Sequence, residues 1–143
     1  MLARKNMSDK KRVLFLCTGN SARSQMAEAL LRNLAGDRYE VSSAGTHPKG
    51  LHPRTVDVMQ EIGIDVGRQS SKDVQDFLDK KFDYVITVCD PARQQCPVFP
   101  GAEPIHWGFD DPAEAPPQNQ VQVFRRVRDE ILHRLSLFII ADR

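Results

Sequence analysis

The sequence lacks any apolar run long enough to cross a membrane or to form the centre of a secretory signal. Its first continuous apolar segment, residues 13–17, is too short for either role. It also lacks internal repeats and an excess of one charge. The net charge of +1 argues against nucleic acid or an anionic membrane as the main partner. We therefore expect a globular protein that acts as a monomer in the cytoplasm.

Cysteine is scarce, and the number is odd: the chain has only Cys17, Cys89 and Cys96. An odd number without a secretory signal disfavours a structural disulfide framework. It favours reactive or buried thiols in a reducing compartment. No Cys-x2-Cys spacing is present, so a zinc site is also disfavoured.

Basic residues crowd the first dozen positions, opposed there only by Asp9. They are Arg4, Lys5, Lys10, Lys11 and Arg12. We expect residues 1–11 to form a flexible basic tail, and residues 12–143 to form a single catalytic domain.

Short apolar segments alternate with segments of helical periodicity. Strands are predicted at 13–17, 39–43, 82–88 and 104–107, and helices at 24–35, 54–61, 74–78 and 121–138. We expect Ser24 to cap the first helix and Gly36 to end it. The inner face of this helix is predicted to consist of Ala27, Leu30, Leu31 and Leu34.

Such alternation predicts an α/β domain of three layers, with a parallel sheet flanked by helices. Ligands of these sheets bind beyond the carboxyl ends of the strands. Cys17, Cys89 and the Asp110-Asp111 pair each follow a predicted strand. We therefore expect them to meet at one edge of the sheet.

The segment between Cys17 and Arg23 predicts an anion-binding loop. Its residues are Thr18, Gly19, Asn20, Ser21 and Ala22. A loop of this length can curl so that successive backbone N–H groups surround a tetrahedral oxyanion. The following helix adds its N-terminal dipole, and Arg23 adds a planar fork that can bind two oxygens.

The same positive field favours the thiolate of Cys17, which is the nucleophilic form. Ser24 is placed to donate a hydroxyl hydrogen bond to it. The alternative is that Cys17 is simply a buried cysteine at the end of a strand.

An oxygen leaves an oxyanion centre readily only when it is protonated, so a general acid is needed. Asp111 fits because Pro112 holds the residue before it in an extended conformation. The neighbouring Asp110 is interpreted as a structural or solvated charge.

Cys89 and Cys96 bear on the class of reaction. A phosphatase needs no second thiol, whereas a reductase must supply two electrons, which the formation of a disulfide provides. Cys96 could resolve a bond between Cys17 and Cys89. The alternatives are two buried cysteines, or a metal site with Cys17 and His106.

Several segments together resemble the thioredoxin-coupled arsenate reductases, which have the low-molecular-weight protein tyrosine phosphatase fold. They are Leu16–Glu28, Ser42–Gly45, Val88–Asp90, Cys96–Pro97 and His106–Ala113. The resemblance covers essentially everything from Lys11 onward, and it implies a four-stranded parallel sheet flanked by helices.

By that resemblance Cys17 attacks arsenate, which Arg23 and the loop amides bind, and Asp111 is the general acid. Cys89 then attacks Cys17 so that arsenite leaves, and Cys96 resolves the disulfide. The resemblance implies no bound cofactor, with external thioredoxin or a similar dithiol as the reductant. The alternative is a tyrosine phosphatase, against which Ala113 stands where an aromatic residue would line the site.

Some members of the family bind potassium near the first loop. The matching positions here are Asn20, Glu28, Ser43, Ser70 and, in place of an aspartate, Lys72. The hypothesis is that the Lys72 ammonium replaces the cation, with Glu28 as its partner.

Overall fold

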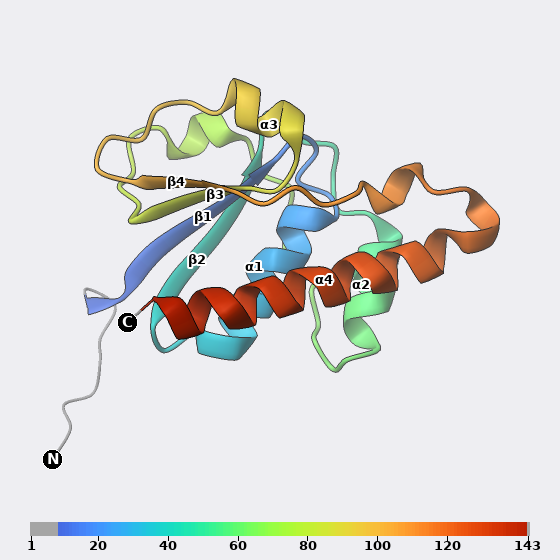
Figure 1. Ribbon diagram of the computed structural model, residues 1–143. Helices are drawn as coiled ribbons and strands as arrows, with labels where there is room; N and C mark the ends of the chain where they lie inside the picture. The colour runs from blue at the N-terminus through green and yellow to red at the C-terminus, as the bar shows by residue number, and fades with distance from the viewer. Residues whose placement is uncertain (1–8, 143) are drawn as a thin grey trace, which may run out of the picture.

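A computed structural model describes residues 9–142, and it contains one sheet of four parallel strands in the order β2-β1-β3-β4 (Figure 1). The strands are β1 (Lys11–Cys17), β2 (Tyr39–Gly45), β3 (Tyr84–Thr87) and β4 (Glu103–His106). All three strand pairs are parallel, so the four carboxyl ends lie at one edge of the sheet.

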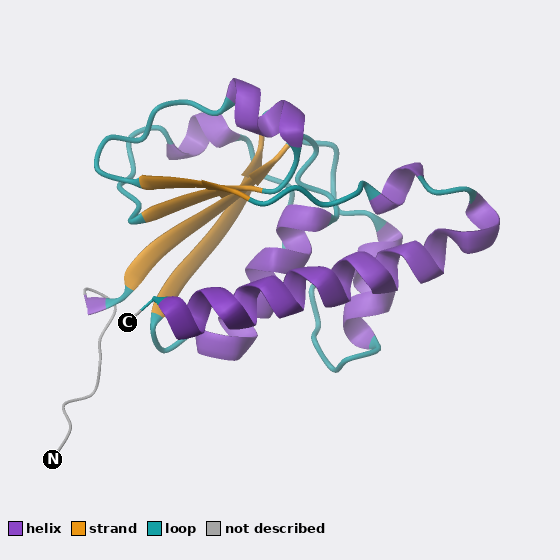
Figure 2. Cartoon of the chain, in the orientation of Figure 1, coloured by secondary structure: helices purple, strands orange, loops and turns teal. Residues whose placement is uncertain are grey.

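Helices cover both faces of this sheet. The α-helices are α1 (Arg23–Ala35), α2 (Pro53–Gln60), α3 (Asp90–Gln95) and α4 (Gln120–Ala141). The 3-10 helices are η2 (Val74–Phe77), η3 (Pro112–Glu114) and η4 (Pro117–Asn119). Figure 2 shows α1, α2 and α4 on one face, and α3 with η2 on the other. No helix within residues 9–142 is long and apolar enough to span a membrane.

The predicted fold class is confirmed, with local differences. The third strand is shorter than the predicted 82–88, although its flanks still bond to β1: Asp83 N–H donates to Arg12 O and Val88 N–H to Leu16 O. Lys11 belongs to β1 rather than to a tail. Residues 1–8 of the predicted tail lie outside the described residues.

Two predictions for α1 are wrong. Ala22 occupies the N-cap and makes no side-chain cap bond, because the Ser24 hydroxyl lies against the sulfur of Cys17 instead. Leu34 is 43% exposed, whereas Leu30 and Leu31 are buried as predicted. Gly36 follows the last helical residue, but its conformation is right-handed rather than the left-handed cap.

The strand that leads to the site runs through the centre of the core. Residues 13–16 of β1 are fully buried between β2 and β3, as a continuous apolar run predicts. At its end Cys17 pairs with Gly45 of β2. A side chain at Gly45 would approach Thr18 O to 2.5 Å, so only glycine lets the loop after β1 lie against β2.

Asp142, just after α4, ties the C-terminal end of the chain to the amino ends of three strands. It pairs with Lys11 of β1 at 2.7 Å and accepts hydrogen bonds from Tyr39 of β2 and Tyr84 of β3. Burial alone would raise the pKa of Asp142, but these hydrogen bonds outweigh it and lower the pKa to about 2. The pKa of Tyr39 is raised by burial and by this carboxylate.

We expect Asp142→Ala to lower the free energy of unfolding by about 2–4 kcal/mol, because two tyrosine hydroxyls lose their acceptor. Since the pKa falls from 3.8 to about 2 on folding, the ionic part is fully present above pH 3.8 and is lost as the pH drops through about 2. Urea denaturation of both proteins at several pH values checks this. Exposed Asp79 supplies a control, Asp79→Ala, which should change stability by less than about 0.5 kcal/mol. Equal stability of Asp142→Ala and the wild type would contradict the prediction.

Candidate active site

Backbone hydrogen bonds to its carbonyl groups fix the loop that follows β1 against segment 46–52. Segment 46–52 donates backbone N–H groups to the carbonyls of Cys17, Thr18, Gly19 and Ser21, at 2.9 to 3.1 Å. The carbonyls are thus used on the outer side of the loop, whereas the Asn20 N–H points at the Cys17 sulfur. This arrangement agrees with an anion cradle, and the binding of an oxyanion by the loop stays a prediction.

Cys17, the last residue of β1, is buried, with 3% of its surface exposed. The Asn20 N–H donates to its sulfur at 3.2 Å, and Ser24 Oγ lies 2.8 Å from that sulfur. Ser24 Oγ also accepts a hydrogen bond from Asn20 Nδ2, so its own hydrogen is free to point at the sulfur. The Cys17 sulfur is thus contacted by a backbone N–H and by a hydroxyl at the start of α1.

Asn20 organises the loop. Its φ of 45° is in the left-handed region, which asparagine tolerates better than most residues. Its side-chain Nδ2 donates to Ser24 and Ser43, and its side-chain Oδ1 accepts from the backbone N–H of Lys72. The residue is fully buried, and these contacts make it a hydrogen-bonding centre within the loop.

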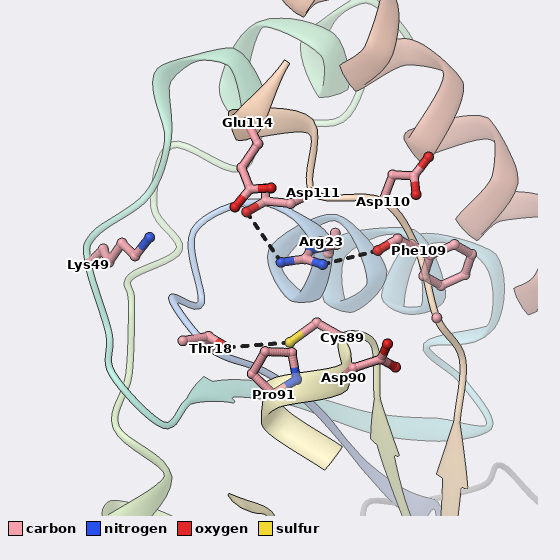
Figure 3. A pocket seen from close by; sticks show the side chains of 11 residues that line it. Thr18, Arg23, Lys49, Cys89, Asp90, Pro91, Phe109, Asp110, Asp111 and Glu114 are labelled. Atoms are coloured by element: carbon pink, nitrogen blue, oxygen red, sulfur yellow. Dashed lines mark hydrogen bonds and ion pairs between the residues drawn. The ribbon is translucent and has the colours of Figure 1, made fainter. Parts of the chain in front are cut away.

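Arg23, the first residue of α1, connects the loop to the segment that carries Asp111. Its guanidinium donates to Phe109 O at 3.0 Å and lies 3.5 Å from Asp111 (Figure 3). The Asp111 carboxylate also accepts the Ala113 N–H at 3.0 Å, which fixes it at the start of η3. Arg23, Asp111 and Cys89 line one cavity of 640 Å³. Asp110 pairs with Arg126 at 3.0 Å, which agrees with a structural charge, although it also borders the cavity.

Lys49 is a cavity residue that sequence reasoning missed. Its backbone N–H donates to Gly19 O, and its aliphatic stem lies across Gly19, so close that a side chain there would sit 3.3 Å from it. Its ammonium extends toward the cavity (Figure 3). Only the fold reveals this contact, because the segment around Lys49 reads as an ordinary loop.

The structure separates the two further thiols. Cys89 is buried at the N-cap of α3, and its sulfur lies 3.5 Å from Thr18 Oγ1 at the anion cavity. Cys96 follows α3 and borders a second cavity of 330 Å³ instead. Burial raises the pKa of the Cys96 thiol. All three cysteines are free.

The five residues of the candidate cation site come together. Ser43 donates to Glu28, whose buried carboxylate lies 3.6 Å from Lys72 Nζ. The Lys72 ammonium also donates to Ser70 O at 2.7 Å. Arg32 pairs with the other oxygen of Glu28 at 2.7 Å. Within residues 9–142, no group of three or more His, Cys, Asp or Glu is arranged to hold a metal ion.

The fold and the loop define a class. Residues 12–141 match the model of the low molecular weight phosphotyrosine protein phosphatase family, and the chain belongs to that family. Within it the chain belongs with the arsenate reductases. It is 47% identical over 133 residues to the arsenate reductase of Halalkalibacterium halodurans, covering 91% of this chain and 96% of the relative. The arsenate reductase of Bacillus subtilis is 44% identical, with the same coverage.

Solved structures of arsenate reductases are also similar to this chain. A structure described as an arsenate reductase in the phosphate binding state superposes with a TM-score of 0.75 at 31% identity, covering 93% of this chain and 99% of that one. A thioredoxin-dependent arsenate reductase from Corynebacterium glutamicum gives 0.69 at 31% identity, covering 93% and 65%. A low molecular weight protein tyrosine phosphatase from T. tengcongensis gives 0.78 at 23% identity, covering 92% and 99%, which shows a shared fold alone.

Proposed function

We propose that this protein reduces arsenate to arsenite by a relay of three thiols, with thioredoxin or a similar external dithiol as the final reductant. The relatives named arsenate reductase support the reaction, and the thioredoxin-dependent neighbour supports the class of reductant. The observation that carries the relay is the placement of Cys89 at the cavity of the Cys17 loop, with Cys96 at the far end of α3. One chain holds all three thiols, so a monomer suffices. An odd number of cysteines suits a reducing compartment, which supports the cytoplasm.

The first step is displacement at arsenic. The loop amides and Arg23 hold the oxyanion, and the Cys17 thiolate forms a sulfur–arsenic bond. The arsenic–oxygen bond breaks, and Asp111 supplies the proton with which the oxygen leaves as water. Asp111 must then be protonated again from solvent, which its 26% exposed side chain permits.

The second step is the reduction. The Cys89 thiolate attacks the Cys17 sulfur and forms a disulfide, while the sulfur–arsenic bond breaks and its electron pair stays on arsenic. Arsenic(V) becomes arsenic(III), and arsenite leaves. Cys96 then attacks Cys89, which frees Cys17 and leaves a Cys89–Cys96 disulfide for the external dithiol to reduce.

Without an external dithiol, the wild type should form one arsenite per chain and lose two of its three thiols. Cys96→Ser should still form one arsenite per chain, because Cys17 and Cys89 complete the reduction. Its steady-state rate with thioredoxin should fall by at least about 100-fold, because the Cys17–Cys89 bond stays unresolved near the buried anion loop. Arsenite yield and thiol titration measure both. An unimpaired steady state would remove Cys96 from the relay. Turnover of an aryl phosphate without thiol loss, and no arsenite, would indicate a phosphatase.

We also infer that the Lys72 ammonium stands where some relatives would hold potassium, since it already contacts Glu28 and Ser70 O. A bound cation would compete with this charge. Replacing sodium by potassium at equal ionic strength should therefore leave the thermal midpoint unchanged within about 1 °C. A clear stabilisation by potassium alone would contradict this inference.

A further inference from the structure

Three side chains form a hydrogen-bonded chain beside the segment that links the second and third thiols. His106, the last residue of β4, contacts Asp90 Oδ1 through Nε2 at 2.8 Å. Its other nitrogen, Nδ1, lies 2.7 Å from Thr87 Oγ1 at the end of β3. Asp90 is the first residue of α3 and directly follows Cys89. The chain therefore connects the start of α3 to two strands of the sheet.

One donor in this chain can be assigned. A carboxylate only accepts hydrogen bonds, so His106 Nε2 carries the hydrogen that it shares with Asp90. On the other side of the ring, Nδ1 lies against the Thr87 hydroxyl, which also contacts Ile105 O at 3.4 Å. His106 is held by the end of β3, and the side chain of His106 is 19% exposed. The sheet thus presents an oriented donor to a residue of α3.

The segment that Asp90 begins must change shape during the relay. Cys89 and Cys96 flank the six residues of α3. A helical rise of about 1.5 Å per residue puts their Cα atoms about 10 Å apart. A disulfide requires Cα atoms within about 4.4–6.8 Å. Forming the Cys89–Cys96 bond therefore requires α3 to unwind.

The described side chains of α3 make few polar contacts with the rest of the fold. Asp90 to His106 is the one hydrogen bond that the described side chains of α3 make to another element. Ala92 is fully buried and supplies apolar packing. Gln94 and Gln95 are exposed. The Asp90–His106 contact is thus a specific tie on a short helix that has to open.

We propose that Asp90 and His106 form a clasp that stabilises the helical, dithiol form of the Cys89–Cys96 segment, and so sets how readily this pair is oxidised. The inference rests on the proposed function in taking Cys89–Cys96 as the final disulfide. The clasp exists while α3 is wound and is lost when α3 unwinds. It therefore opposes formation of the disulfide and favours its reduction by the external dithiol. Both residues are positioning residues, because neither touches a reacting atom.

The experiment is a redox equilibrium of the Cys89–Cys96 pair against oxidised and reduced dithiothreitol, in full-length Cys17→Ser protein. In this exchange the two protein thiols give two electrons and two protons to the reagent disulfide. Removing the clasp should shift the equilibrium toward the protein disulfide by about three- to tenfold, and tenfold corresponds to about 30 mV for this two-electron couple. The potential should become more negative.

A double-mutant cycle separates the clasp from other effects of the same substitutions. Asp90→Ala also removes an acidic residue from the first turn of α3, and His106→Ala also alters the edge of the sheet. Their coupling should be at least about threefold, because either change alone removes the clasp. Asp90→Asn keeps an acceptor for Nε2 and should recover part of the shift. Gln95→Ala, on the same helix, should show no coupling to His106→Ala.

The outcomes are distinct from those of the proposed function, because no arsenate is present. Coupling between Asp90 and His106 supports the clasp whether or not the protein reduces arsenate. The proposal would be overturned if the disulfide forms but the effects of Asp90→Ala and His106→Ala on the redox equilibrium are additive. It would also be overturned if Asp90→Ala shifts that equilibrium toward the dithiol. If His106→Ala fails to fold, the variants Asp90→Ala and Asp90→Asn still test the clasp. Equal reduction potentials for these two variants and for the Cys17→Ser parent would overturn the proposal.

Discussion

Replacing Cys17 with serine is expected to lower the rate of arsenite formation by on the order of 10⁴-fold or more. A serine hydroxyl is not ionised at neutral pH, so the hydrogen bonds from Ser24 and the Asn20 N–H have no thiolate to stabilise. The serine also cannot form the disulfide that supplies the electrons. Arsenite released after rapid mixing with arsenate, with reduced thioredoxin present, measures the effect.

The binding of arsenate should survive this substitution. The carbonyls of the loop remain bonded to segment 46–52, which keeps the backbone of the loop in place, and Arg23 is unchanged. Calorimetric titration should give a Kd within about tenfold of the wild type. Ser24→Ala is the matched control, because it removes one donor to the sulfur and keeps the nucleophile, and it should cost about 10- to 100-fold in rate. Comparable arsenite formation by Cys17→Ser and wild type would move the nucleophile to Cys89.

The sequence predicts the fold because local pattern and global architecture agree. The buried run of β1 and the alternation of strands and helices admit a parallel sheet with few alternatives. That architecture brings the ends of β1, β3 and β4 together, so that Thr18 of the loop after Cys17 lines one cavity with Cys89 and Asp111. The location of the candidate site, at the carboxyl ends of these strands, can therefore be predicted from the sequence without knowledge of side-chain contacts.

Side-chain contacts within the loop were less predictable. Ser24 stands near the start of α1, where serine commonly caps a helix. Its hydroxyl instead contacts the Cys17 sulfur and accepts a hydrogen bond from the side-chain amide of Asn20. Tertiary bonding overrides the local preference. No sequence motif marks Lys49 as a cavity residue, because its position depends on how segment 46–52 packs against Gly19. Leu34 fits the helical period but lies beyond the reach of the core.

The Asp90–His106 contact shows the same limit. The two residues are 16 positions apart, on a short helix and on the edge strand of the sheet. Helical spacing predicts nothing about such a pair, and the histidine has no ligand spacing. The contact follows from the parallel pairing of β3 with β4, which sets His106 beside Thr87 and next to the start of α3.

Asp111→Asn is expected to slow the first step, formation of the sulfur–arsenic bond, by about 10²- to 10⁴-fold. Asparagine keeps an oxygen that can accept the Ala113 N–H, so the start of η3 should stay in place. What it cannot do is donate a proton to the departing oxygen. Rapid-quench measurement of arsenite in a single turnover measures this step, since the later thiol exchanges need no proton from residue 111.

The control is the neighbouring carboxylate. Asp110 borders the same cavity, but it is 74% exposed and pairs with Arg126. Asp110→Asn should therefore change the single-turnover rate by less than about threefold. Both variants change the net charge equally, so a purely electrostatic effect of the cavity wall would slow or speed them alike. A rate loss confined to Asp111→Asn identifies proton transfer, whereas a loss confined to Asp110→Asn would assign the acid to the other residue. The conversion of a Cys17–Cys89 disulfide to Cys89–Cys96 should proceed at the wild-type rate in both, because that exchange depends on α3 and its clasp rather than on the acid.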